Sequence, residues 1–252
     1  MKLPLRIAVL ECDTPLEKTK AKYGGYGGVF KQLLQRGADK LGHPGLSSTE
    51  GMELTVFNVE SNPGVFPKME DIDAIILTGS RHDSFANTPW INQLVDFVKD
   101  VLASDQVRIF GVCFGHQIVG RALGQRVYRG EAGWEVSQVP LRLSEKGKEI
   151  FKVSDMSLYQ MHKDIVYGYP SGTEALGETD ICLNQGMYIK NKVITVQGHP
   201  EFTHDIVEEL LESRHEMGVL TDELFEDAMR RLPDHDDGVV VAQAVFRFLL
   251  ED

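Results

Sequence analysis

The residue best suited to covalent chemistry in this 252-residue sequence is a cysteine that stands between two glycines. The apolar run 107–112 is typical of a buried strand, and the segment 114–123 after Cys113 has the apolar spacing of a helix. Gly111 and Gly115 keep side chains out of the turn, so the pattern predicts a nucleophile elbow. Such a turn places the thiol at a helix N-terminus, where backbone N–H groups favour the thiolate. The alternative is a buried structural cysteine.

A thiol nucleophile needs a base, and His199-Pro200-Glu201 offers one directly after the predicted strand 193–197. A histidine at the end of a strand can present its imidazole at the sheet edge where Cys113 is expected. The carboxylate two residues later can then hold the other ring nitrogen. On residue types alone, an ordinary turn without catalytic role stays open.

Taken together, the Gly-x-Cys-x-Gly-x-Gln sequence at 111–117 and the His-Pro-Glu sequence 86 residues beyond the cysteine resemble the class I glutamine amidotransferase family. The resemblance covers about residues 5–205, and it implies a doubly wound α/β fold with a Cys-His-Glu triad and no cofactor. The site residues that it implies are the nucleophile Cys113, the general base and acid His199, its orienting partner Glu201 and the substrate-holding Gln117.

The resemblance also implies an oxyanion hole made by two backbone N–H groups. One is expected from Phe114 and the other from the turn at Gly79 and Ser80, where this chain reads Gly-Ser-Arg in place of the common Gly-Gly-Pro. A backbone N–H survives that change, so we expect an intact hole. Arg81 and His82 make its rim polar and are candidate substrate-binding residues.

Three segments, 22–26, 79–85 and 113–117, narrow the resemblance to the plant γ-glutamyl peptidases. The favoured function is therefore hydrolysis of a γ-glutamyl amide, in a glutathione-like compound or conjugate, through a thioester on Cys113. One alternative is a glutaminase subunit that delivers ammonia to a separate synthase, because only about 50 residues follow the motifs. A second alternative is a non-catalytic binding protein of the same fold. The sequence leaves the leaving group, the pathway and the oligomeric state open.

The remaining histidines need separate treatment. His162, in the sequence Met-His-Lys-Asp at 161–164, lies where many family members carry a polar turn facing the pocket. It is a candidate substrate-binding residue, with a surface turn as the alternative. None of the histidines has convincing metal-ligand spacing, so we expect no metal site.

Strands and helices must bring these motifs together. In the first half, apolar runs alternate with helical segments, which predicts a parallel sheet with right-handed crossovers. In the second half, four apolar runs have short connections, which predicts an antiparallel addition; these runs are 136–143, 156–161, 186–190 and 193–197. Three helices are predicted after them, at 205–217, 221–231 and 238–250. The predicted fold class is α/β: a doubly wound, mostly parallel sheet flanked by helices, with an antiparallel addition and a helical C-terminal extension.

The net charge of −12 is unevenly distributed. Residues 204–252 hold 14 acidic and 4 basic side chains, a net charge of −10, and the rest of the chain is net −2. We therefore expect an amidotransferase-like domain at 1–203 and an acidic helical extension packed on it, whose binding of a partner stays open. The lack of a basic patch argues against nucleic acid as a partner. No apolar run is long enough to span a membrane, and three cysteines without CxxC spacing favour a cytoplasmic location with Cys12 and Cys182 structural.

Overall fold

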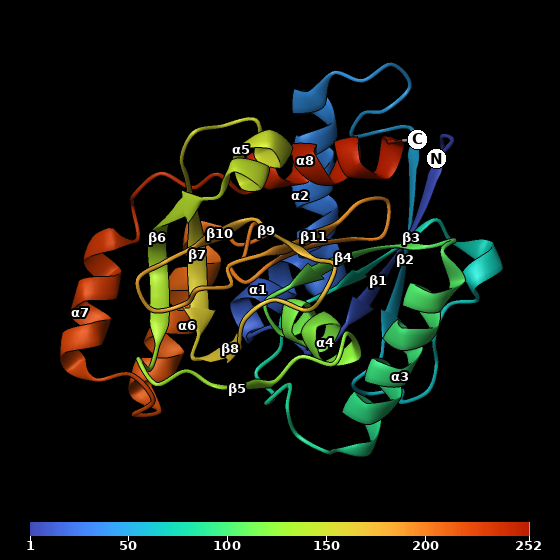
Figure 1. Cartoon of the computed structure of the whole chain (residues 1–252). Helices are drawn as coiled ribbons and strands as arrows, with labels where there is room; N and C mark the ends of the chain where they lie inside the picture. The colour runs from blue at the N-terminus through green and yellow to red at the C-terminus, as the bar shows by residue number, and fades with distance from the viewer. Residues whose placement is uncertain (252) are drawn as a thin grey trace.

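A seven-stranded sheet forms the centre of the computed structural model, which describes residues 1–251. Its strands are β1 (Leu5–Glu11), β2 (Met52–Asn58), β3 (Ala74–Leu77), β4 (Arg108–Val112), β9 (Glu174–Ala175), β11 (Met187–Ile189) and β12 (Val193–Val196). Their order across the sheet is β2-β1-β3-β4-β12-β11-β9 (Figure 1). The first five strands in this order are parallel, β11 pairs antiparallel with β12, and β9 pairs antiparallel with β11.

Two smaller antiparallel sheets lie beside the central one. One is three-stranded and consists of β10 (Gly177–Glu178), β6 (Glu135–Leu143) and β7 (Met156–His162); the other pairs β5 (Val127–Arg129) with β8 (Asp164–Val166). A single bridge joins Tyr159 of β7 to His199, just after β12. The second-half sheets therefore meet the central sheet at the place where the histidine motif stands.

Helices cover both faces of the central sheet (Figure 1). Those on one face are α2 (Tyr26–Leu41), α5 (Glu145–Phe151) and α8 (Gly238–Leu250), and those on the other are α3 (Pro89–Ser104) and α4 (Phe114–Ala122). The remaining helices are α1 (Glu17–Tyr23), α6 (His204–Glu216), α7 (Asp222–Arg231) and a 3₁₀ turn (Met69–Asp71). Helices α6 and α7 contact each other, and α7 also contacts β6.

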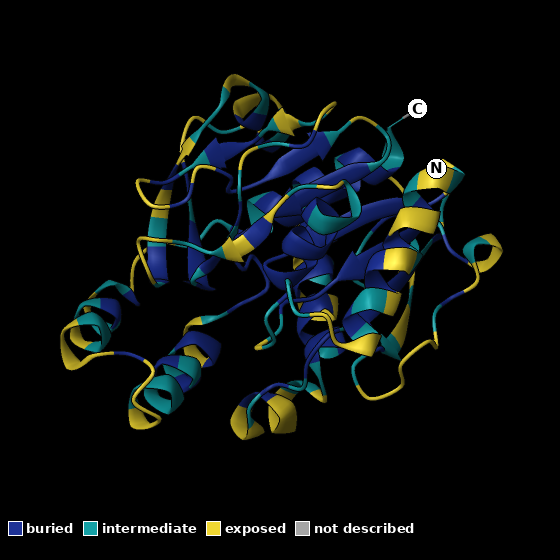
Figure 2. Cartoon of the chain, turned by 60° about the horizontal axis from the view of Figure 1, so that its bottom comes forward, coloured by how far each residue is buried: buried dark blue, intermediate teal, exposed yellow. Residues whose placement is uncertain are grey.

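The alternation of side chains along β1 divides the apolar core into two parts. Ile7 and Val9 pack with residues of α2 and α8, whereas Ala8 and Leu10 pack with residues of α3 and α4. Successive side chains of a strand point to opposite faces, so a strand buried on both faces is apolar throughout. Figure 2 shows the central strands almost wholly buried, with exposed residues on the outer sides of the helices.

The predicted fold class is confirmed, including the antiparallel addition and the three C-terminal helices, each of which lies within one residue of its predicted bounds. The short helices α1 and α5 and the short strands β5, β8, β9 and β10 had no counterpart in the prediction. Helix α1 buries one residue, Thr19, and α5 buries two, so neither leaves an apolar pattern that sequence analysis can detect. No helix within residues 1–251 is long and apolar enough to cross a membrane.

Candidate active site

Cys113 lies on the sharp turn between β4 and α4. Its backbone has φ 51° and ψ −104°, a conformation that costs energy in a non-glycine residue. The neighbouring glycines permit the turn: a Cβ on Gly111 would lie 2.9 Å from the carbonyl oxygen of Gly115, and one on Gly115 would lie 2.3 Å from the carbonyl oxygen of Leu77. The predicted strand–turn–helix geometry around Cys113 is therefore present.

His199 reaches the same sheet edge because β12 lies next to β4 in the sheet. Its Nδ1 lies 2.8 Å from Oε1 of Glu201, and its ring stacks on Phe202 with centroids 3.9 Å apart. The backbone N–H of His199 donates to the carbonyl oxygen of Tyr159 at 2.7 Å. A Cβ on Gly79 would lie 2.6 Å from Cε1 of His199 and 3.7 Å from Cβ of Cys113. The turn after β3 therefore contacts both residues.

The electrostatic surroundings of His199 favour its protonated form. Burial of the ring acts in the opposite direction, but the negative charges of Cys113 and Glu201, and hydrogen bonds to both, raise the pKa of His199 above its usual value. An imidazolium beside a thiolate is the arrangement that activates cysteine nucleophiles. By contrast, burial raises the pKa of Cys182 to about 12 and also raises the pKa of Cys12, so both stay protonated thiols.

The turn that follows β3 and the first residue of α4 have backbone N–H groups without an acceptor in the described part of the chain. Among the described residues, no acceptor takes the N–H of Gly79, Ser80 or Phe114. The next N–H, that of Arg81, donates to Oδ2 of the buried Asp13 at 2.6 Å. Asp13 thus holds the turn in place, a contact that the sequence did not reveal because 68 residues separate the two partners.

The predicted substrate-binding residues lie together around one cavity, which we call the Cys113 cavity. Their polar atoms are largely engaged with protein. The amide of Gln117 accepts from Ser84 and donates to the carbonyl oxygen of Asp164 and to Gln197. Nε2 of His162 lies 2.9 Å from a carboxylate oxygen of Glu135, and Nε2 of His82 lies 2.7 Å from one of Glu60. The guanidinium of Arg81 forms ion pairs with Glu60, at 3.2 Å, and with Asp13, at 2.8 Å.

A charged cluster on the same cavity includes one residue that sequence analysis missed, Arg129. Its guanidinium lies 2.9 Å from Asp83 and 3.0 Å from Asp164. Arg129 and Asp164 face each other in the pairing of β5 with β8. Both strands are three residues long, so their pairing leaves no pattern in the sequence.

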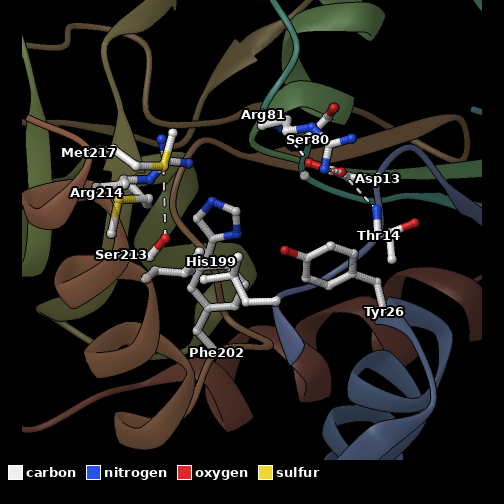
Figure 3. Close-up of a pocket in the computed structure, with 14 residues that line it drawn as sticks. Asp13, Thr14, Tyr26, Ser80, Arg81, His199, Phe202, Ser213, Arg214 and Met217 are labelled. Atoms are coloured by element: carbon white, nitrogen blue, oxygen red, sulfur yellow. Dashed lines mark hydrogen bonds and ion pairs between the residues drawn. The ribbon is translucent and has the colours of Figure 1, made fainter. Parts of the chain in front are cut away.

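A second cavity of about 140 Å³, which we call the His199 cavity, adjoins the first and contains His199 (Figure 3). It is lined by apolar side chains, including Tyr26, Met161 and Phe202, and by Asp13 and Arg81. Helix α6 and its C-cap residue Met217 contribute four further residues, Leu210, Ser213, Arg214 and Met217. The sequence predicted that this helix packs on the domain, but it did not indicate that these four residues line a cavity. No group of three or more metal-ligating side chains occurs within the described chain.

The fold and this constellation define a class of protein that comparisons with known sequences identify. The model of the family described as glutamine amidotransferase class-I matches residues 43–214, and the chain belongs to this family.

Individual relatives extend over almost the whole chain. A glutamine amidotransferase-like protein of Schizosaccharomyces pombe is 37% identical over 250 residues, which cover 97% of this chain and 98% of the relative. Gamma-glutamyl peptidase 2 of Arabidopsis thaliana is 28% identical over 232 residues, 88% of this chain and 86% of the relative. A glutamine amidotransferase of Methylobacillus flagellatus has the same fold, with a TM-score of 0.74, 17% identity and coverage of 99% of this chain and 95% of that one.

Proposed function

We propose that this protein hydrolyses γ-glutamyl amide bonds through a γ-glutamyl thioester on Cys113. The observation that carries the proposal is the juxtaposition of Cys113, on its strained turn, with the hydrogen-bonded pair of His199 and Glu201. Membership in the class I glutamine amidotransferase family and the similarity to plant γ-glutamyl peptidases support the same chemistry.

In the proposed reaction, the Cys113 thiolate attacks the γ-carbonyl carbon and the carbonyl oxygen becomes an oxyanion. The free N–H groups of Gly79 or Ser80 and of Phe114 donate to that oxygen. His199 gives its proton to the leaving amine, the C–N bond breaks and the thioester remains. His199 then takes a proton from water, whose oxygen attacks the thioester, and glutamate leaves as the thiol is restored.

Glu201 would orient the imidazole of His199 during both steps. The cluster of Asp83, Arg129 and Asp164 offers both signs of charge to the α-amino and α-carboxylate groups of the glutamyl part, and it lies on the cavity that contains Cys113. Gln117 and His162, whose amide and ring are held by protein groups, would shape this cavity. Arg81 and His82 would form its rim.

The leaving group separates two versions of this function. A peptide amine needs room next to the scissile bond, and the His199 cavity, which adjoins the Cys113 cavity and has a volume of about 140 Å³, could accommodate it. We therefore favour a γ-glutamyl peptidase that acts on glutathione-like compounds. A glutaminase that supplies ammonia to a separate synthase is the second candidate, favoured by the family to which the chain belongs.

The test is to incubate the purified chain with glutamine, glutathione and a glutathione S-conjugate, and to measure glutamate and ammonia. Glutamate without ammonia from the tripeptides supports the peptidase, whereas ammonia from glutamine supports the glutaminase. A protein that turns over none of these and forms no adduct with a glutamine-analogue electrophile at Cys113 is a non-catalytic member of the fold.

Replacement of the proposed nucleophile gives the first prediction. Cys113→Ala removes the attacking atom, so we expect turnover to fall by at least about 10³-fold. The unfolding midpoint should stay near the wild-type value, because Ala fits the small buried site. Cys182→Ala is the matched control and should retain turnover. Activity in Cys113→Ala comparable to that of the wild type would contradict the assignment.

A further inference from the structure

The two cavities adjoin each other, and each contains one of the two side chains that react in the proposed function. The Cys113 cavity contains the sulfur that attacks the carbonyl, and the His199 cavity contains the imidazole that faces the leaving amine. Four residues line both cavities: Ser80, Arg81, Met161 and Arg214. The acyl part of a substrate therefore belongs on the Cys113 side, and its leaving group belongs in the His199 cavity.

Arg214 stands at this junction without an acidic partner among the described residues. No ion pair or side-chain hydrogen bond of its guanidinium occurs among these residues, and its Nε is buried with no acceptor. The other two arginines of the site are paired, Arg129 with Asp83 and Arg81 with Asp13. A buried donor of a charged group that lacks an acceptor is costly, so such a group marks a place where a ligand supplies one.

The guanidinium of Arg214 is positioned by an aromatic ring and by the helix that carries it. Its central carbon lies 5.1 Å from the centre of the Trp134 ring, and the ammonium of Lys163 lies 5.0 Å from the centre of the same ring. Helix α6 fixes its backbone, and Figure 3 shows Arg214 with Ser213 and Met217 on one side of His199, across from Tyr26 and Asp13. Tyr26, Cys113 and Asp13 are the groups whose charges act on Arg214. Cys113 also faces His199, and Asp13 also forms an ion pair with Arg81.

The wall of the His199 cavity indicates the rest of the ligand. Most of its lining is apolar, from Leu16, Tyr26, Met161, Phe202, Leu210 and Met217. An apolar side chain next to the scissile amide would bury its surface there. A carboxylate is the group that a planar guanidinium binds best.

We propose that the His199 cavity binds the leaving group of a γ-glutamyl peptide, and that Arg214 binds the free carboxylate of that leaving group. This inference rests on the proposed function and names its substrate class: γ-glutamyl peptides with an apolar residue after the scissile amide and an unblocked C-terminus. Arg214 is then a specificity-determining residue supplied by the acidic extension.

The test compares γ-glutamyl-leucine with γ-glutamyl-leucinamide, which differ only in the carboxylate. The wild-type protein should prefer the carboxylate substrate by about 10- to 100-fold in kcat/KM, the range of one charge-assisted hydrogen-bonded contact. Arg214→Met should bring this ratio close to one, and Arg214→Lys should keep part of it. Arg230→Met, at an exposed arginine of α7, is the matched control and should leave the ratio unchanged.

Two results would overturn the inference while leaving the proposed function intact. One is a wild-type protein that hydrolyses both substrates equally well, which needs no variant and so does not depend on how Arg214→Met folds. The other is an equal loss on both substrates in Arg214→Met, which would place Arg214 on the glutamyl part. Failure of the proposed function has a different signature, namely no hydrolysis of either substrate or of glutamine, and it overturns both.

Discussion

Three cysteines with the same side chain have different surroundings in this protein. Cys12 and Cys182 are buried among groups that keep the thiol protonated, whereas Cys113 faces the imidazole of His199. The flanking glycines identified Cys113 in the sequence because only glycine fits so close to the backbone at 111 and 115. The steric constraint acts on residues next to Cys113 in the chain and is therefore visible as flanking glycines, so this part of the candidate site could be predicted.

Arg129 and Arg214 could not be predicted in the same way. Arg129 meets Asp83 and Asp164, which are 46 and 35 residues away, and Arg214 meets Trp134 across 80 residues. The position of a single arginine in the sequence does not indicate which distant residues it contacts. These contacts depend on how β5, β8 and α6 pack, which is a long-range property of the fold.

The second prediction concerns the pair of His199 and Glu201. The carboxylate of Glu201 raises the pKa of His199, so Glu201→Gln should lower it, and the imidazolium should lose its proton at a lower pH. The alkaline limb of the pH profile of kcat/KM should therefore move toward acid by about one pH unit or more. The control is Glu209→Gln, which alters a buried carboxylate that accepts a hydrogen bond from the backbone N–H of Thr19. Its alkaline limb should lie at the same pH as that of the wild-type protein. An unmoved limb in Glu201→Gln would contradict the coupling.

At the scale of elements, the arrangement of the site follows from the adjacency of β4 and β12. These strands are far apart in the chain but neighbours in the sheet, so the turns after them lie side by side. A hydrogen bond also connects α4, the helix after β4, to β12, because Nδ1 of His116 lies 2.8 Å from Oγ1 of Thr195. The long buried strands and helices could be predicted from their apolar periodicity, whereas α1 and α5 could not, because they bury too little.

His116 gives a prediction about stability. Burial lowers the pKa of His116 to about 3, so the unfolded chain binds a proton between about pH 6.5 and pH 3 that the folded chain does not. Stability is then fully present above pH 6.5 and falls as the pH falls through this window. Between pH 7 and pH 5 the wild-type protein should lose about 2 kcal/mol more than His116→Gln.

Urea unfolding of both proteins at the two pH values checks this difference, since other titrating groups are common to both. His43, an exposed histidine, provides the matched substitution His43→Gln, which should keep the wild-type slope. Equal pH dependence in His116→Gln and the wild-type protein would show that His116 is charged in the folded state.

At the scale of the whole molecule, the acidic extension has two separate structural roles. Helix α8 packs on α2 and contributes to the main core, whereas α6 and α7 pack around β6 and β7, with α6 lining the His199 cavity. The family match ends at residue 214, within α6. A single acidic segment in the sequence is thus divided between stability and the candidate site.

This division predicts that stability and substrate preference can be changed independently. Phe246 of α8 is fully buried in the main core, so Phe246→Ala should lower the free energy of unfolding by about 3–5 kcal/mol. Phe225→Ala, on the half-buried α7, should cost less than about 2 kcal/mol. Phe246→Ala should keep the wild-type ratio of kcat/KM for γ-glutamyl-leucine over γ-glutamyl-leucinamide, measured below the unfolding transition. A changed ratio in Phe246→Ala would mean that α8 sets the position of α6, so that the two roles are coupled.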